Sequence, residues 1–271
     1  MVISEKNRSA IGILDSGVGG LTVAKEVIRQ LPCEMIYYLG DVARCPYGSR
    51  NDAEIRTFAL KMIDFLVEFP LKALLIACNT VNSILSLEKL EQQLAIPVLG
   101  VIKPGARAAI RVTKSNSIGV LGTEATIRSR AYDNALYSFH PYLDITTLAC
   151  PTFVPLVEQG RRNDPESGVI IANHLQSFNR LGLDTVILGC THYPLLTDHI
   201  SAAMGDGVRI VSSAAETASE LSAILERCNL LSFEQNPRHR FFTTGNINSF
   251  RAVAEDWLEQ KLEICQIMLS K

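Results

Sequence analysis

Two cysteines stand in matching surroundings of this chain. Cys78 occurs in Ala77-Cys78-Asn79-Thr80, and Cys190 occurs in Gly189-Cys190-Thr191-His192, about 112 residues later. Each follows an apolar run and precedes small or polar residues, which is typical of a turn from a strand into a helix. The amides at a helix N-terminus carry partial positive charge, so a thiol there is favoured as thiolate. A single cysteine of this kind is most often structural, but two in equivalent places indicate chemistry.

Two such thiols on opposite sides of one bound molecule suit inversion at a carbon centre. One base removes a proton from one face, and an acid returns a proton to the other face. Because the two groups exchange roles in the reverse direction, chemically alike groups are expected. Acyl transfer would need one nucleophile, a base and an oxyanion hole instead. The duplication favours two-base chemistry, and a cysteine amidohydrolase that uses Cys190 and His192 is the alternative from another class.

Further polar residues lie close to these turns. Asp15 could bind a substrate ammonium or set the protonation of Cys78, and a role as helix N-cap is equally open. His192 could assist Cys190, or hold its own turn by a backbone hydrogen bond. Glu158 either reaches the cleft or is solvated. Neutral donors near helix starts suit carboxylate binding, although Thr123 and Thr126 are equally plausible caps; these donors are Ser16, Asn79, Thr80, Thr123, Thr126 and Thr191.

The elements that position these residues alternate between strand and helix. Asp52–Phe69 has apolar residues at helical spacing, and Asp164-Pro165 is typical of a helix start. The alternation predicts an α/β fold with mainly parallel sheets covered on both faces. Strands are expected at Ile11–Leu14, Met35–Leu39, Ala73–Ala77, Val98–Val101, Ile118–Leu121, Ile145–Leu148, Thr185–Leu188, Val208–Val211 and Phe241–Thr244.

A weak internal repeat indicates two related halves. Ile11-Gly12-Ile13-Leu14-Asp15-Ser16 resembles Ile118-Gly119-Val120-Leu121-Gly122-Thr123, about 107 residues later, and the two cysteine segments repeat at a similar offset. We therefore expect two similar Rossmann-like α/β domains related by a pseudo-twofold axis. Residues 1–99 and 210–271 would form the first, and residues 100–209 the second. Ligands of parallel sheets bind beyond the carboxyl ends of the strands, so the active site is expected in the cleft between the domains.

Composition and motifs disfavour several other classes of function. The formal net charge of −2 with no basic run disfavours nucleic acid as the main partner. No apolar stretch approaches the roughly 20 residues that span a bilayer, and the polar N-terminus lacks a signal-peptide core. We therefore expect a cytoplasmic protein with no membrane partner. The seven cysteines form no CxxC pair and the histidines lack ligand spacing, so no metal site is predicted.

The glycine-rich turn Gly17-Val18-Gly19-Gly20 raises the question of a dinucleotide. Asp41 stands about where a ribose-binding acid would be expected. However, Thr22 occupies the third glycine position of the GxGxxG pattern, and Asp15 beside the loop would repel a pyrophosphate. The sequence therefore disfavours a dinucleotide site.

Several segments together resemble the glutamate racemase family over nearly the full length of the chain. They are residues 12–22, Asp41-Val42-Ala43-Arg44-Cys45-Pro46-Tyr47-Gly48, Ala77-Cys78-Asn79-Thr80, Phe153-Val154-Pro155-Leu156-Val157-Glu158 and Gly189-Cys190-Thr191-His192-Tyr193-Pro194-Leu195.

The resemblance implies conversion of L-glutamate to D-glutamate for peptidoglycan, without a cofactor. Cys78 and Cys190 would be the acid/base pair, and the family's usual state implies a homodimer. The resemblance also supports Glu158 as a residue of the active site. Around the substrate it implies Asp15, Ser16, Tyr47, Gly48, Asn79, Thr80, Thr191 and His192.

Two segments depart from the family pattern. Val81-Asn82-Ser83 stands where small residues such as alanine are usual, and Ser212-Ser213-Ala214-Ala215 where an Asp-Ser-Gly-Ala segment is common. Neither removes a catalytic group. Within the superfamily, the alternative function is that of an aspartate racemase or related isomerase. A further alternative is a binding protein on an inactivated racemase scaffold.

Overall fold

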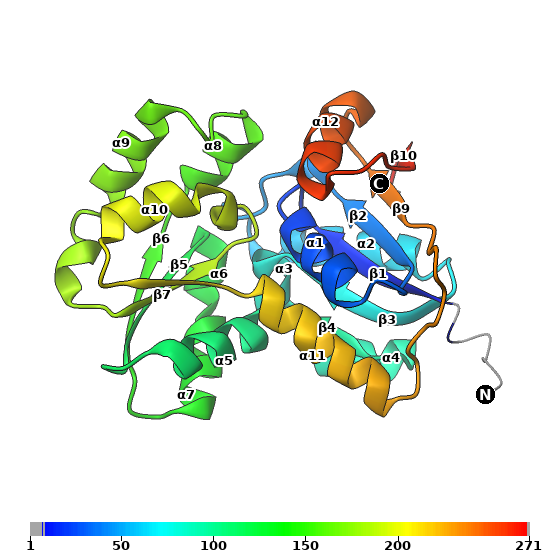
Figure 1. Ribbon diagram of the computed structural model, residues 1–271, viewed down its shortest axis with the longest axis horizontal. Coiled ribbons are helices and arrows are strands. Elements are labelled where there is room, and N and C mark those ends of the chain that lie inside the picture. Colours follow the sequence, from blue (N-terminus) through cyan, green and yellow to red (C-terminus); the bar gives the residue numbers. More distant parts are fainter. Residues whose placement is uncertain (1–6, 8, 270–271) are drawn as a thin grey trace.

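The computed structural model describes residues 7 and 9–269, which form two α/β domains side by side (Figure 1). The first sheet has the order β10-β9-β2-β1-β3-β4 and the second the order β6-β5-β7-β8, and every pairing is parallel. The strands are β1 Ala10–Asp15, β2 Ile36–Gly40, β3 Leu71–Ile76, β4 Val98–Gly100, β5 Ser117–Gly122, β6 Asp144–Ala149, β7 Thr185–Gly189, β8 Arg209–Ser212, β9 Arg240–Thr243 and β10 Ile264–Gln266.

The two sheets share one connectivity. The order β2-β1-β3-β4 in the first domain corresponds to β6-β5-β7-β8 in the second, so β1 matches β5 and β3 matches β7. This confirms the predicted α/β class with two similar, mainly parallel domains. Because β3 and β7 correspond, Cys78 and Cys190 follow the carboxyl ends of equivalent strands.

Helices cover both faces of each sheet. The α-helices are α1 Leu21–Gln30, α2 Asp52–Leu66, α3 Asn79–Ile84, α4 Leu87–Leu94, α5 Ile102–Val112, α6 Glu124–Ser129, α7 Ala131–Phe139, α8 Phe153–Glu158, α9 Pro165–Leu175, α10 Thr197–Met204, α11 Ala214–Arg227 and α12 Ile247–Leu258. Short 3-10 helices occupy η2 Val42–Arg44, η3 Phe178–Leu181 and η4 Tyr193–Leu196.

Strand β1 shows why these sequences form buried sheets. Ile11 and Ile13 pack into the cluster under α1, α11 and α12, whereas Ala10 and Leu14 pack into the cluster under α2, α3 and α4. Successive side chains of a strand point to opposite faces, so a strand covered on both faces must be apolar throughout. Burial of each large aliphatic side chain contributes about 1.5–3 kcal/mol. The second sheet has the same arrangement, with α8, α9 and α10 on one face and α5 and α7 on the other.

For the helix predicted at Asp52–Phe69, the start agrees with the structure and the end does not. Helix α2 begins at Asp52, where the Asn51 side chain accepts a hydrogen bond from the Glu54 amide at 3.0 Å, but it ends at Leu66 before the expected Phe69. Asp164 holds the N-cap position of α9. The three-residue strand β10 was not expected from the sequence.

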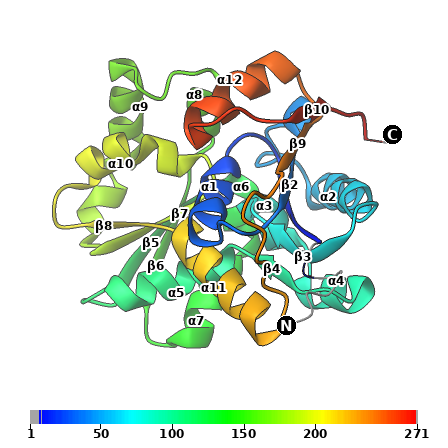
Figure 2. The same cartoon turned by 45° about the vertical axis from the view of Figure 1, so that its right-hand side comes forward.

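Two segments connect the domains. The chain leaves the first sheet after β4 and enters α5, and it returns from β8 to α11, which packs against α1 (Figure 2). Strand β8 pairs with β7, so the second sheet extends to Ser212. Asn82, in one of the departing segments, accepts a hydrogen bond from the Ile102 amide at 2.9 Å and so ties α3 to the start of α5.

No helix among residues 7 and 9–269 is both long enough and apolar enough to cross a membrane.

Candidate active site between the domains

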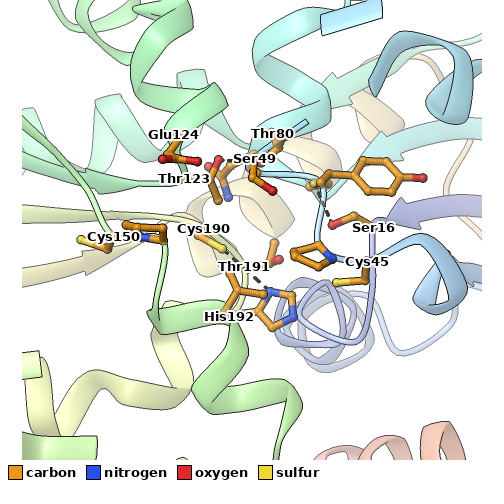
Figure 3. Close-up of a pocket in the computed structure, with 17 residues that line it drawn as sticks. Ser16, Cys45, Ser49, Thr80, Thr123, Glu124, Cys150, Cys190, Thr191 and His192 are labelled. Atoms are coloured by element: carbon orange, nitrogen blue, oxygen red, sulfur yellow. Dashed lines mark hydrogen bonds between the residues drawn. The ribbon is translucent and has the colours of Figure 1, made fainter. Parts of the chain in front are cut away.

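A cavity opens where the carboxyl ends of the strands of both domains meet (Figure 3). Cys78 and Cys190 both line it, from the first and the second domain respectively. The cavity is lined by Ser16, Cys45, Pro46, Tyr47, Gly48, Ser49, Cys78, Asn79, Thr80, Thr123, Glu124, Cys150, Pro151, Val154, Cys190, Thr191 and His192.

Cys78 is a buried thiol at the start of α3. Its Sγ donates to Ser16 Oγ at 3.3 Å, and its side chain is almost fully shielded from solvent. Burial, and then the nearby charge of Asp15, raises the pKa of Cys78 to about 12. This side chain is therefore a protonated thiol at neutral pH and can act as a proton donor.

Cys190 has a different set of neighbours. Its Sγ lies 3.8 Å from Nδ1 of His192, and Nε2 of the same ring lies 2.6 Å from Oε1 of Glu158. Burial alone would lower the pKa of His192, but the hydrogen bonds and charges of Cys190 and Glu158 raise it well above its ordinary value. Burial raises the pKa of Glu158, yet its contact with His192 brings that pKa below the ordinary value. A cationic imidazolium can thus hold a negative charge on Cys190.

Asp15 lies beneath the cavity, fully buried. Its carboxylate accepts from the backbone amides of Gly17, at 3.0 Å, and Gly20, and from Thr191 Oγ1 of the other domain at 3.1 Å. The carboxylate therefore fixes the glycine turn that leads into α1, whose N-cap residue is Gly20 and not Asp15. Burial raises its pKa against the lowering effects of His192 and these hydrogen bonds. Asp15 does not line the cavity, and its charge contributes to the raised pKa of Cys78.

The glycine turn allows the two domains to meet closely. A Cβ on Gly19 would lie 2.5 Å from both His192 Nδ1 and Thr191 Oγ1, which no side chain could tolerate. The turn thus packs the first domain against the Cys190 side of the site. Asp41, for its part, contacts Arg44 and Thr244 at 2.6 and 2.7 Å and also accepts from the Tyr47 hydroxyl, so it anchors the loop that follows β2.

Hydroxyl groups form a polar wall opposite the histidine. Thr80 Oγ1 of the first domain lies 2.8 Å from Thr123 Oγ1 of the second (Figure 3). Thr126 Oγ1 lies 3.0 Å from Thr123 Oγ1. Thr123 is also the N-cap of α6, where it accepts from the Thr126 amide, so capping and lining are combined in one residue. Gly48 accepts from the Ala125 amide at 2.9 Å and adds a second link between the domains.

The structure brings most of the sequence-predicted residues to this cavity. Asp15, Glu158 and Thr126 do not line it but contact residues that do. Tyr47 lines it with its hydroxyl turned to Asp41. Sequence reasoning missed Tyr132, whose hydroxyl donates to Asn79 Oδ1 at 2.7 Å. It also missed these lining residues: Cys45, Ser49, Cys150, Pro151 and Val154.

Comparison with known proteins gives consistent matches. The model of the Asp/Glu/Hydantoin racemase family matches residues 11–221. A glutamate racemase from Listeria monocytogenes is 50% identical over 252 residues, which cover 93% of this chain and 94% of the relative.

Two solved structures extend these matches to the fold. A glutamate racemase from Bacillus anthracis is 49% identical, with a TM-score of 0.93 and coverage of 96% of this chain and 98% of the other. A glutamate racemase from Francisella tularensis, solved with D-glutamate, is 33% identical, with a TM-score of 0.88 and coverage of 97% and 98%.

Proposed function

The chain belongs to the Asp/Glu/Hydantoin racemase family and is an amino-acid racemase, and on that premise we propose that it interconverts L- and D-glutamate by moving the Cα proton between Cys78 and Cys190. The observation that supports this most directly is the pair of buried cysteines at the ends of the equivalent strands β3 and β7. Both line one cavity, from opposite domains. The reaction needs no cofactor in this proposal, because the two thiols supply both proton transfers.

In the direction from L- to D-glutamate, Cys190 removes the Cα proton and Cys78 protonates the opposite face. The surroundings of the two thiols fit this assignment. Cys78 has a raised pKa of about 12 and is ready to donate, while Cys190 faces the cationic His192. With D-glutamate the roles are reversed. Cys78 is then the thiolate base, and its charge lies close to Asp15. The assignment of direction follows the resemblance to glutamate racemases.

Substrate recognition rests on neutral donors. The described residues that line the cavity include no lysine or arginine, so the substrate carboxylates would bind hydroxyl, amide and backbone N–H groups. Hydroxyl, amide and backbone N–H groups can hold carboxylates by hydrogen bonds without a lysine or arginine partner. The groups in these roles are Ser16, Asn79, Thr80, Thr123, Thr191 and the backbone at Gly48.

The product of this activity, D-glutamate, would supply peptidoglycan synthesis, and the active form would be a homodimer. The role in peptidoglycan synthesis and the homodimer are both proposed from the resemblance to glutamate racemases. Sedimentation of the purified chain tests the second.

The first experiment follows L-glutamate in deuterated water with the purified protein and no added cofactor. Loss of optical rotation, with deuterium entering Cα of the D-product, supports two-base racemisation. L-aspartate serves as the parallel substrate. Faster turnover of aspartate than of glutamate would favour the alternative, an aspartate racemase or related isomerase. A folded sample that neither changes the rotation nor exchanges deuterium contradicts the proposal. Full turnover by a Cys78→Ser variant, with a covalent acyl-enzyme, would favour the amidohydrolase alternative.

A further inference from the structure

Three side chains that bind transition metals meet beside the catalytic cavity. Cys45 follows η2 in the first domain, while Glu158 ends α8 and His192 follows β7 in the second. Cys45 Sγ lies 3.7 Å from Glu158 Oε1, which lies 2.6 Å from His192 Nε2, and all three atoms are within 4.8 Å of one another. Glu158 and His192 serve Cys190 in the proposed mechanism, whereas Cys45 has no role there.

The chemistry of these donors matches zinc. Thiolate, imidazole and carboxylate are the usual zinc ligands, at about 2.3 Å for sulfur and about 2.0–2.2 Å for nitrogen and oxygen. Three such ligands around one ion lie roughly 3–4 Å apart from one another, so the cluster needs only a small separation of His192 from Glu158. Because Nδ1 of His192 faces Cys190, Nε2 is the nitrogen that faces the other two ligands.

The cluster can be reached from outside the catalytic cavity. A second cavity of about 310 Å³ is lined by Val42, Cys45, Pro46, Val154, Pro155, Glu158 and Gln159. Cys45, Pro46 and Val154 line both cavities and form part of the wall between them. An ion and its remaining water ligand can therefore approach Cys45 and Glu158 without passing Cys78.

We propose that Cys45, Glu158 and His192 form an inhibitory binding site for Zn²⁺ and similar thiolate-binding divalent cations. On binding, the Cys45 sulfur forms a bond to the ion and its thiol proton passes to solvent water, as does the proton shared by Glu158 and His192. Water completes a site with three protein ligands. The ion then occupies the groups that support Cys190 and links the two domains. The inhibition rests on the proposed racemase function, but the binding does not.

Cobalt binding, measured without substrate, tests the site. Chelator-treated protein is titrated with Co²⁺, and thiolate-to-cobalt charge-transfer absorption is followed, with Zn²⁺ as competitor. We expect one equivalent of Co²⁺ to give this absorption and Zn²⁺ to remove it. Cys45→Ser and Cys45→Ala should weaken binding by more than about 100-fold, since loss of even an outer partner of a ligand costs about 10–100-fold.

Matched variants decide which thiol binds the ion. Cys78→Ser, Cys190→Ser and the exposed Cys228→Ser should each keep the cobalt absorption. Its survival in the folded Cys45 variants, or its loss in Cys190→Ser, would overturn the site. The absence of any cobalt absorption in the folded parent protein would do the same.

Activity separates inhibition from binding. Zn²⁺ should inhibit glutamate racemisation by the parent protein over the concentration range in which it displaces cobalt, and Cys45→Ser should need more than about 100-fold more Zn²⁺. Full activity of the metal-saturated parent would overturn the inhibition. If glutamate is not racemised at all, the proposed function fails, while the cobalt measurement still decides the site.

Discussion

The Tyr132 hydroxyl donates to Asn79 Oδ1 at 2.7 Å across the boundary between the domains. Tyr132 belongs to α7 and is buried. Its ring lies against Gly189, and its hydroxyl lies against Gly105. In this arrangement the Asn79 carbonyl oxygen accepts from the tyrosine hydroxyl. The Asn79 amino group is then the part left to serve the cavity that Asn79 lines. Under the proposed function, Tyr132 is a positioning residue that holds the proposed substrate donor Asn79 from the opposite domain.

Tyr132→Phe should therefore weaken substrate binding more than turnover. The change leaves a buried carbonyl oxygen without its donor, at about 1–3 kcal/mol, and frees the amide to rotate. We expect kcat/KM for glutamate to fall about tenfold, with most of the change in KM. Tyr137→Phe on the same helix, at a residue 40% exposed, is the matched control and should leave both constants unchanged. An equal effect of the two variants would remove Tyr132 from this role.

Replacement of either catalytic thiol should abolish racemisation in both directions. A serine hydroxyl is too weak an acid to replace a thiol, and general acid–base catalysis contributes about 10²–10⁴-fold. Cys78→Ser and Cys190→Ser should each lower kcat by at least about 100-fold, measured by polarimetry from either enantiomer. The exposed Cys228→Ser is the control. Normal racemisation by either single variant would contradict the two-base mechanism.

Asp15→Asn should lower the pKa of Cys78. A negative charge beside a thiol favours its protonated form, and Asp15 is the second-largest cause, after burial, of the raised Cys78 pKa of about 12. Removal of the charge therefore moves the titration to lower pH. The measurement is the pH dependence of Cys78 alkylation by a small haloacetamide in a Cys190→Ser background. Glu124→Gln, at another residue that lines the cavity, should leave this profile in place.

The strands and the two cysteines could be predicted because their signals are local. Apolar runs such as Ile11–Leu14 are short and bounded, and a thiol directly after such a run identifies the carboxyl end of a strand. Strand β10 has only three residues and gives too short a run to recognise. The connectivity shared by the two sheets then explains why similar segments recur about 107–112 residues apart.

The contacts across the domain boundary could not be predicted in the same way. Cys45 and Glu158 are separated by 113 residues, and Tyr132 and Asn79 by 53, so no periodicity connects them. Tyr132 reads in the sequence as an ordinary aromatic residue of a helix. These pairs depend on how two independently packed domains meet, and that is set by contacts such as Gly19 against His192.

Lys72→Met should destabilise the first domain far more than an equivalent surface change. Lys72 pairs with Glu34, and both side chains are almost completely buried. Lys72 also donates to the carbonyl of Leu230 at 2.8 Å. Removal of one partner leaves a buried charge unpaired, which costs about 3–5 kcal/mol. Urea unfolding measures the loss. Lys103→Met breaks the exposed pair with Glu88 and should cost less than about 1 kcal/mol; equal losses would contradict the prediction.

Glu158→Gln should shift the pH profile of racemisation. The Glu158 carboxylate is one cause of the raised His192 pKa, acting through its hydrogen bond and its charge. A neutral glutamine loses the charge, so the pKa of His192 falls and the imidazolium beside Cys190 loses its proton at a lower pH. If this cation holds the Cys190 thiolate, the alkaline limit of kcat/KM for L-glutamate moves to lower pH. Glu124→Gln is the control, because it alters a cavity carboxylate outside the His192 contacts. A profile that keeps its limits in Glu158→Gln while only its height falls would show that Glu158 does not act through the charge of His192.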